Sequence, residues 1–281
     1  MQPEPSNPNE TSHEIATFYE FFQVDEPEQL RDWIEQQGQA AGVRGTVLLA
    51  REGINGTLSG ARANLEALVD ALKAHCGVEL RQLKISRSNV APFRRFRVKV
   101  KPELVTFKQD DADPLRATGV YLNPREWDEV IARPEVRLID TRNDYETAVG
   151  RFEGAEDPNT ENFTDFATYV DEHLDPERDQ EIAMYCTGGI RCEKASSFLL
   201  AKGFQRVYHL DGGILRYLEE TDPEDSRWQG ECYVFDERVS VGHDLEPGHF
   251  RNCAGCGWPA ERGCACAKCG AVDGEGTASP A

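Results

Sequence analysis

The sequence predicts an α/β protein, of α+β type overall, with two domains followed by a cysteine-rich tail. Strand-like and helix-like segments alternate in two series, and an acidic, proline-containing linker at 102–118 separates them. A length of 281 residues exceeds what a single core usually holds, which also favours two domains. Five of the nine cysteines lie in the last thirty residues, so residues 223–281 are expected to form a C-terminal extension.

The composition is typical of a cytoplasmic protein. No apolar run approaches the roughly 20 residues that a membrane helix needs, so no membrane partner is expected. Residues 1–14 lack the basic and apolar regions of a signal peptide and are expected to be a disordered tail. Clustered cysteines without an export signal favour metal binding or catalysis over disulfides.

The first domain, residues 15–101, has the order of strands and helices of a ferredoxin-like fold. The glycines of "EGINGTLSG", Gly53, Gly56 and Gly60, are expected to serve turn geometry. The expected elements are a strand at 17–22, a helix at 27–41, a strand at 45–51, a glycine-rich turn with a short strand, a helix at 62–75, and strands within 78–86 and 95–101.

A basic stripe closes this domain. The formal net charge of −19 counts against a nucleic-acid partner. Yet "PFRRFRVKVKPE" carries Arg94, Arg95, Arg97, Lys99 and Lys101, and the alternation from Arg95 onward predicts a strand with a basic face and an apolar face. The stripe is either a solvated strand face or a surface for an anionic partner, and the lack of interleaved acids favours the partner.

The second domain, residues 119–222, is predicted to hold a parallel sheet, because its short strands are separated by helices. In such sheets sites form beyond the carboxyl ends of strands, where Cys186 follows an apolar strand. The expected elements are a helix from 124, a strand at 136–140, a helix at 162–174, a strand at 182–185, a helix from about 192 to 202, a strand at 206–210, and a helix to 220.

The loop "CTGGIR" indicates a reactive cysteine. A lone cysteine at a strand end is usually a small core residue. Here two glycines and Arg191 follow Cys186, and the loop opens onto a helix N-terminus. Main-chain N–H groups, the helix end and the arginine all favour the thiolate, so we expect a nucleophile.

The spacing of the loop separates two chemistries. Cysteine-dependent phosphatases place five residues between the cysteine and the arginine, whereas Arg191 arrives one residue earlier and leaves Cys192 in that position. The tighter loop suits a single sulfur atom better than a phosphate. Cys192 either resolves an oxidised Cys186 as a disulfide or packs inward at the helix start.

"CTGGIR", preceded by "LIDTRNDYE" and followed by "GFQRVYHLDGGI", resembles a rhodanese domain, whose cysteine carries a persulfide. Together with "REGINGTLSG", "PFRRFRVKVKPELV" and "WQGECYVFDERVSV", these blocks resemble the tRNA uridine hydroxylase family. The resemblance runs in order from about residue 15 to 269.

The resemblance implies an oxidoreductase that uses dioxygen to form 5-hydroxyuridine at the wobble uridine, position 34, of tRNAs in a bacterial cytoplasm. It implies that Cys186 is the active-site cysteine with a persulfide intermediate and that Arg191 closes its loop. The basic stripe would then contact tRNA phosphates. The residues expected to support the loop are Thr187, Gly188, Gly189, Ile190, Asp140 and Arg142.

The cofactor and the electron donor are not indicated by any motif. Oxygen chemistry normally uses a flavin, a haem or non-haem iron, but the sequence shows no glycine fingerprint after a strand and no His/carboxylate triad. If the chain uses dioxygen as a substrate, as the resemblance implies, we expect sulfur chemistry at Cys186 in place of a metal.

Two C-x-x-C pairs in the tail, Cys253/Cys256 and Cys266/Cys269, predict a structural zinc site. The gap of nine residues between the pairs is short for a zinc ribbon, and Cys264 is left over. The alternative is a reduced tail whose thiols take part in redox exchange.

Two other functions stay open at this point. A rhodanese-type sulfurtransferase would use a Cys186 persulfide but would leave the first domain and the basic stripe without a role. A non-enzymatic tRNA-binding or redox-sensing module would not need a loop that stabilises a thiolate.

Overall fold

The computed structural model describes residues 13–88 and 91–272, and the chain divides into two compact units between Leu104 and Val105. Most of the expected disordered tail at 1–14 lies outside the described residues. Its last two residues, however, already belong to the first strand, which begins at His13. Within the described ranges, no helix is both long enough and apolar enough to cross a bilayer.

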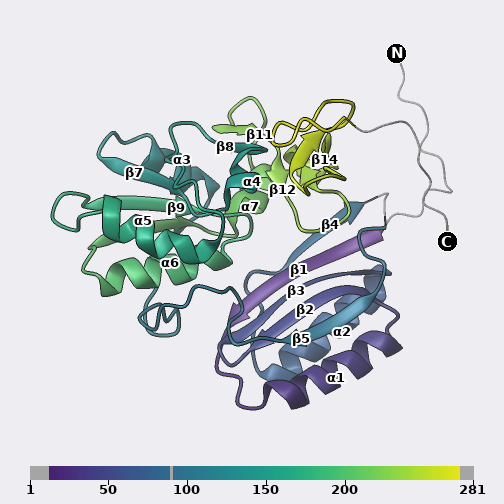
Figure 1. Ribbon diagram of the computed structural model, residues 1–281. Coiled ribbons are helices and arrows are strands. Elements are labelled where there is room, and N and C mark those ends of the chain that lie inside the picture. The colour runs from purple at the N-terminus through teal and green to yellow at the C-terminus, as the bar shows by residue number, and fades with distance from the viewer. Residues whose placement is uncertain (1–12, 89–90, 273–281) are drawn as a thin grey trace. The chain divides into compact units, whose positions relative to one another are not determined.

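The first unit has one five-stranded sheet in the order β4-β1-β3-β2-β5. Strand β3 is antiparallel to β1 and β2, and β5 extends the ferredoxin-like sheet as an edge strand parallel to β2. Figure 1 shows α1 and α2 side by side on one face of this sheet. The elements are β1 (His13–Phe21), α1 (Pro27–Ala40), β2 (Arg44–Ala50), β3 (Gly53–Gly60), α2 (Arg62–Cys76), β4 (Lys84–Ser88) and β5 (Phe96–Val100).

The apolar stripe of α2 holds this helix on the sheet. Leu65, Leu68, Val69 and Leu72 are buried and pack in one core with residues of β1, β2 and β3. Gly77 ends the helix in a left-handed conformation, with φ of 68°, as glycine commonly does at this position.

The glycine-rich segment is expected to form a turn with a short strand. The turn is confined to 51–52, and Gly53, Gly56 and Gly60 instead lie in the central strand β3. Gly53 follows a two-residue connection, and a Cβ there would lie 2.1 Å from the Glu20 carbonyl oxygen. A Cβ on Gly56 would lie 2.6 Å from the Phe18 ring. These two glycines therefore permit close packing against β1, where any side chain would clash.

The second unit has a parallel sheet in the order β6-β10-β9-β7. One face packs against α5 and α6, and the other packs against α3 and α7. The elements are β6 (Val120–Leu122), α3 (Pro124–Ile131), β7 (Val136–Asp140), α4 (Asp144–Thr147), β8 (Gly150–Phe152), a 3₁₀ turn (Phe163–Asp165), α5 (Phe166–His173), β9 (Glu181–Tyr185), α6 (Ile190–Ala201), β10 (Arg206–Leu210) and α7 (Gly213–Glu220).

The segment expected to be a linker, 102–118, is largely part of the second unit. Phe107 is fully buried, and its ring lies 4.5 Å from that of Phe163 and 5.2 Å from that of Phe198. The Lys194 ammonium donates to the Val105 carbonyl oxygen at 3.1 Å. The acidic composition favours a spacer, but Phe107 and Ala112 are buried in the core of the second unit.

The C-terminal extension begins inside the second unit. Strand β11 (Trp228–Gly230) pairs with β8, and Trp228 packs edge-on against Phe152 in the core. The remaining elements are short pairs and one turn: β12 (Cys232–Tyr233) with β13 (Ser240–Val241), a 3₁₀ turn (His243–Leu245), and β14 (Phe250–Asn252) with β15 (Pro259–Glu261).

Candidate active site

Cys186 lies directly after β9, at the carboxyl edge of the parallel sheet, as the sequence predicts. The N–H of Gly189 donates to its Sγ at 3.1 Å. Gly189 has φ of 103°, a conformation that side chains rarely adopt, and this turns the following helix α6 toward the sulfur. The thiol itself is 1% exposed, so a reactant reaches it only when the covering groups move.

The surroundings of Cys186 stabilise its thiolate. Burial raises the pKa of the thiol, but the hydrogen bond from Cys192, the charge of Arg191 and two main-chain N–H groups outweigh burial and lower the pKa from 9.0 to about 6. Cys186 is therefore mostly ionised at neutral pH.

Cys192 is the neutral partner of this thiolate. Burial and the neighbouring Cys186 raise the pKa of Cys192 well above its usual value. Its Sγ also lies 3.5 Å from the Thr141 hydroxyl, which donates to the Tyr185 carbonyl oxygen. A protonated Cys192 beside an ionised Cys186 acts as a hydrogen-bond donor, and neither cysteine is in a disulfide.

Arg191 is held under the loop by a carboxylate that the sequence reasoning missed. Its two terminal nitrogens each lie 2.6 Å from an oxygen of Glu146, and both side chains are almost fully buried. Thr187 donates its hydroxyl to the same carboxylate at 3.1 Å. Burial would disfavour both charges, but each stabilises the other, which raises the pKa of Arg191 and lowers that of Glu146.

Glu146 owes its place to local structure. It is the third residue of the short helix α4, and its side chain also accepts the N–H of Asn143 in a capping box. Glu146 lies in "LIDTRNDYE", and a glutamate three residues after an asparagine is the sequence pattern of a capping box, which could have predicted its position.

Asp140 and Arg142 form a second buried ion pair that supports the site. The Arg142 guanidinium donates to the Asp140 carboxylate at 2.7 and 2.9 Å. It also donates to the carbonyl oxygens of Glu146 and Gly150 at 3.1 and 2.6 Å. Arg142 thus fixes both ends of the segment that carries Glu146.

The first turn of α7 also supports the Cys186 loop. The N–H groups of Ile214 and Leu215 donate to the carbonyl oxygens of Cys186 and Thr187 at 3.0 and 3.1 Å. A Cβ on Gly213 would lie 2.5 Å from the Cys186 oxygen, and this glycine has φ of 63°. Only glycine fits here. Gly188, by contrast, has open space around it, and Ile190 starts α6.

The basic stripe lies on the first unit, along β5 and its flanks. Phe96 faces α1, because its ring occupies the space that a Cβ on Gly38 would need. The alternating basic side chains therefore point away from the helices. All five are exposed: Arg94, Arg95, Arg97, Lys99 and Lys101.

The four cysteines of the two C-x-x-C pairs meet in the tail. Their sulfur atoms all lie within 4.8 Å of one another: Cys253, Cys256, Cys266 and Cys269. Cys264 lies outside this group and is exposed.

A parallel sheet with a thiolate loop at its carboxyl edge, in a chain that also holds a ferredoxin-like unit, defines a two-domain protein of rhodanese type. Residues 123–220 match the rhodanese-like domain, and residues 13–104 match the UPF0176 acylphosphatase-like domain. Over 247 residues the chain is 47% identical to the tRNA uridine(34) hydroxylase of Picosynechococcus sp., covering 88% of this chain and 83% of that protein. The chain belongs to the tRNA uridine(34) hydroxylase family.

Two solved structures resemble single domains. The rhodanese-like domain of an Anabaena sp. protein is 18% identical and covers 39% of this chain and 78% of its own, with a TM-score of 0.32. An acylphosphatase from Coxiella burnetii is 16% identical and covers 31% of this chain and 93% of its own, with a TM-score of 0.24.

Proposed function

We propose that this protein hydroxylates C5 of the wobble uridine of tRNA in the cytoplasm, giving 5-hydroxyuridine, and that Cys186 is the reacting group. The observation that carries the proposal is a thiolate with a pKa of about 6 in a chain that belongs to the tRNA uridine(34) hydroxylase family. The net reaction consumes uridine, dioxygen, two electrons and two protons, and it yields 5-hydroxyuridine and water. The two electrons come from an external reductant.

Each supporting residue has a distinct role in this proposal. Arg191 stabilises the Cys186 thiolate by its charge, and Glu146 keeps the guanidinium in position. Cys192 donates a hydrogen bond to the sulfur and stays protonated at neutral pH. A thiolate of this kind can also carry a second sulfur atom as a persulfide.

The basic stripe is the proposed contact surface for tRNA. Its side chains are exposed, and those from Arg95 to Lys101 alternate with apolar residues along an edge strand. Arginine and lysine on such a surface neutralise phosphates and position the RNA without reading its bases. The stripe is thus a locally basic surface in a chain whose net charge is acidic.

The low pKa of Cys186 also favours a second function, sulfur transfer. The thiolate would attack the outer sulfur of a persulfide donor R–S–SH. A new bond then forms between Cys186 and that sulfur, the S–S bond of the donor breaks, and R–S⁻ leaves. This step needs no electron donor, and the sulfur would then pass to an acceptor.

Nucleoside mass spectrometry of cellular tRNA separates these functions. We expect cells that carry only Cys186→Ser to lose 5-hydroxyuridine and its derivatives, whereas Cys76→Ser, a matched change in the first unit, keeps them. Loss of thiolated nucleosides instead would favour sulfur transfer. Unchanged nucleosides in Cys186→Ser would contradict both enzymatic functions and leave a binding or redox-sensing module.

A further inference from the structure

The four cysteines of the tail form a site of the size that a tetrahedral metal ion requires. Cys253 and Cys269 lie 3.6 Å apart at their sulfurs, and so do Cys256 and Cys266. Zinc–sulfur bonds of ~2.3 Å in a tetrahedron place the sulfurs ~3.8 Å apart. A disulfide would bring two of them to ~2.05 Å. The spacing therefore fits metal ligation better than pairing.

The two C-x-x-C loops also have the same main-chain geometry. The N–H of Gly257 donates to the Cys253 carbonyl oxygen at 2.8 Å, and Gly270 donates to the Cys266 oxygen at the same distance. Each glycine directly follows the second cysteine of its pair, and the two have φ of 76° and 72°.

The match extends to the next hydrogen bond of each loop. The N–H of Cys253 donates to the Trp258 carbonyl oxygen at 2.8 Å, and that of Cys266 donates to the Ala271 oxygen at 2.9 Å. Two copies of one turn thus face each other with their thiols converging. The repetition is independent of the distances between the sulfurs, and it is the arrangement that one ion between two matched loops would require.

This part of the chain has too little apolar surface to fold by burial alone. Its core contains three buried residues, and two of them are cysteines: Cys253, Ala260 and Cys266. A segment this small normally depends on disulfides or a metal ion. Four thiolates in a tetrahedron select zinc or iron, and zinc is the usual structural ion of such sets.

Trp258 connects these loops to a pocket on the rhodanese-type unit. It follows Gly257, its carbonyl accepts the N–H of Cys253, and the ammonium of Lys268 lies 4.1 Å from its ring centre. Lys268 belongs to the second loop, so both loops fix the ring.

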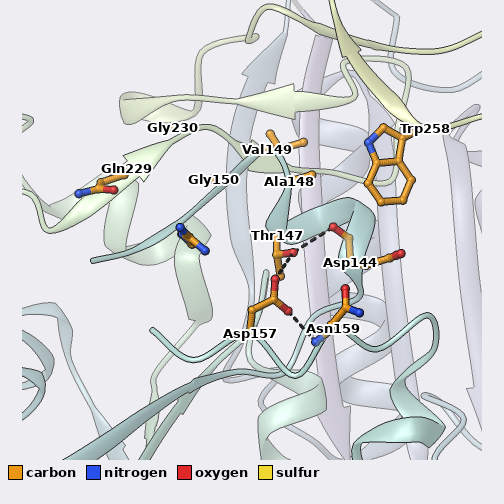
Figure 2. Close-up of a pocket in the computed structure, with 11 residues that line it drawn as sticks. Asp144, Thr147, Ala148, Val149, Gly150, Asp157, Asn159, Gln229, Gly230 and Trp258 are labelled. Carbon is orange, nitrogen blue, oxygen red and sulfur yellow. Dashed lines mark hydrogen bonds between the residues drawn. The ribbon is translucent and has the colours of Figure 1, made fainter. Parts of the chain in front are cut away.

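The indole ring is one wall of a pocket of about 550 Å³. Figure 2 shows the ring together with the side chains of Asp144, Asp157 and Asn159. The Thr147 hydroxyl donates a hydrogen bond to Asp157. The lining of the pocket includes Asp144 and Thr147, which lie on either side of Glu146 in the segment that Arg142 holds.

We infer that Cys253, Cys256, Cys266 and Cys269 bind one Zn²⁺ ion, and that this ion holds Trp258 in the wall of the pocket. Cys264 takes no part: its carbonyl oxygen accepts from Arg251, and its thiol lies near Glu261. The ion is structural, because all four positions of a tetrahedral zinc are filled by protein and none is left for a substrate.

The metal content of the full-length protein, purified without chelators, tests the ion. We expect one zinc per chain by elemental mass spectrometry and a loss of most of it in Cys256→Ser, while Cys264→Ser retains it. Clearly substoichiometric zinc in the wild-type chain, or stoichiometric iron in its place, would overturn the inference whether or not the variants fold. Equal loss in Cys264→Ser would also overturn the ligand set.

Fluorescence of Trp258 tests the second part of the inference. The signal of this residue is the difference between the wild-type chain and Trp258→Phe. We expect a zinc chelator to change that difference spectrum strongly and zinc to restore it. A chelator that removes the zinc and leaves the difference spectrum unchanged would show that the ion does not hold the ring.

Discussion

The hydrogen bond between Cys192 and Cys186 can be tested by removing it. The pKa of Cys186 is about 6, against 9.0 for an ordinary thiol, which corresponds to about 4 kcal/mol in favour of the thiolate. A hydrogen bond to a charged group contributes roughly 1.5–3 kcal/mol. Replacing Cys192 by Ala should therefore raise the pKa of Cys186 by about one to two, since 1.36 kcal/mol is about one pKa unit.

The ionised fraction follows from these values. At pH 7 about nine-tenths of Cys186 is thiolate in the wild-type chain, and about a tenth to a half would be thiolate in Cys192→Ala. The assay is the rate of iodoacetamide labelling against pH, with Cys186 identified by peptide mass spectrometry because eight other cysteines are present.

The control is Cys76→Ala, a cysteine at the end of α2 in the first unit. In Cys76→Ala we expect the pH midpoint of Cys186 labelling to match that of the wild-type chain. A Cys192→Ala midpoint equal to the wild-type value would refute the role of the Cys192 thiol. A wild-type midpoint near 9 would refute the stabilised thiolate altogether.

Three further predictions concern the supports of the site and the RNA surface. Glu146→Gln should lower the free energy of unfolding by about 3–5 kcal/mol in thermal or denaturant unfolding, because it leaves the Arg191 charge buried without its partner; exposed Glu153→Gln should change it little. The pKa of Glu146 is lowered in the folded state. The stability that the ionised Glu146 contributes should therefore be present above the usual carboxyl pKa and be lost as the pH falls through the lowered value. Equal acid sensitivity of the wild-type chain and Glu146→Gln would contradict this. Gly213→Ala should abolish labelling or activity at Cys186, because the new Cβ displaces the loop. The control is Gly154→Ala, where φ is positive but the space is open, so only the cost of the left-handed backbone conformation is expected. Equal effects of the two substitutions would argue against the contact between Gly213 and the Cys186 carbonyl oxygen. Arg95→Ala combined with Arg97→Ala should weaken tRNA binding for all sequences and reduce the slope of log K against log salt concentration by about 2. The control Arg125→Ala should change neither the affinity nor the slope. If the double variant also leaves both unchanged, the stripe is only a solvated surface.

Much of the fold follows from local patterns. The alternation of charge and apolar residues along β5 correctly gives an exposed basic face, and the apolar stripe of α2 correctly gives its buried side. Because Cys186 directly follows the buried strand β9, the sequence correctly predicts that this cysteine lies at the carboxyl edge of the sheet. In each case the determining residues are neighbours in sequence, so periodicity alone carries the information.

The errors have the opposite origin. Gly53 and Gly56 have the composition of a turn, but the close approach of β1 decides their role. Phe107 lies in an acidic segment, and its partners Phe163 and Phe198 are far along the chain. Glu146 pairs with Arg191 across 45 positions. Contacts between distant segments leave no periodic signal in a single sequence.

The central claim is that the Cys186 thiolate carries out hydroxylation with dioxygen. Its most direct test is mass spectrometry of tRNA nucleosides from cells exposed to isotopically labelled dioxygen. We expect the new C5 hydroxyl to carry the heavy isotope in cells with the wild-type chain, and we expect no labelled nucleoside in cells with Cys186→Ser alone. Labelled 5-hydroxyuridine at the wild-type level in Cys186→Ser, or a hydroxyl whose oxygen derives from water, would contradict it.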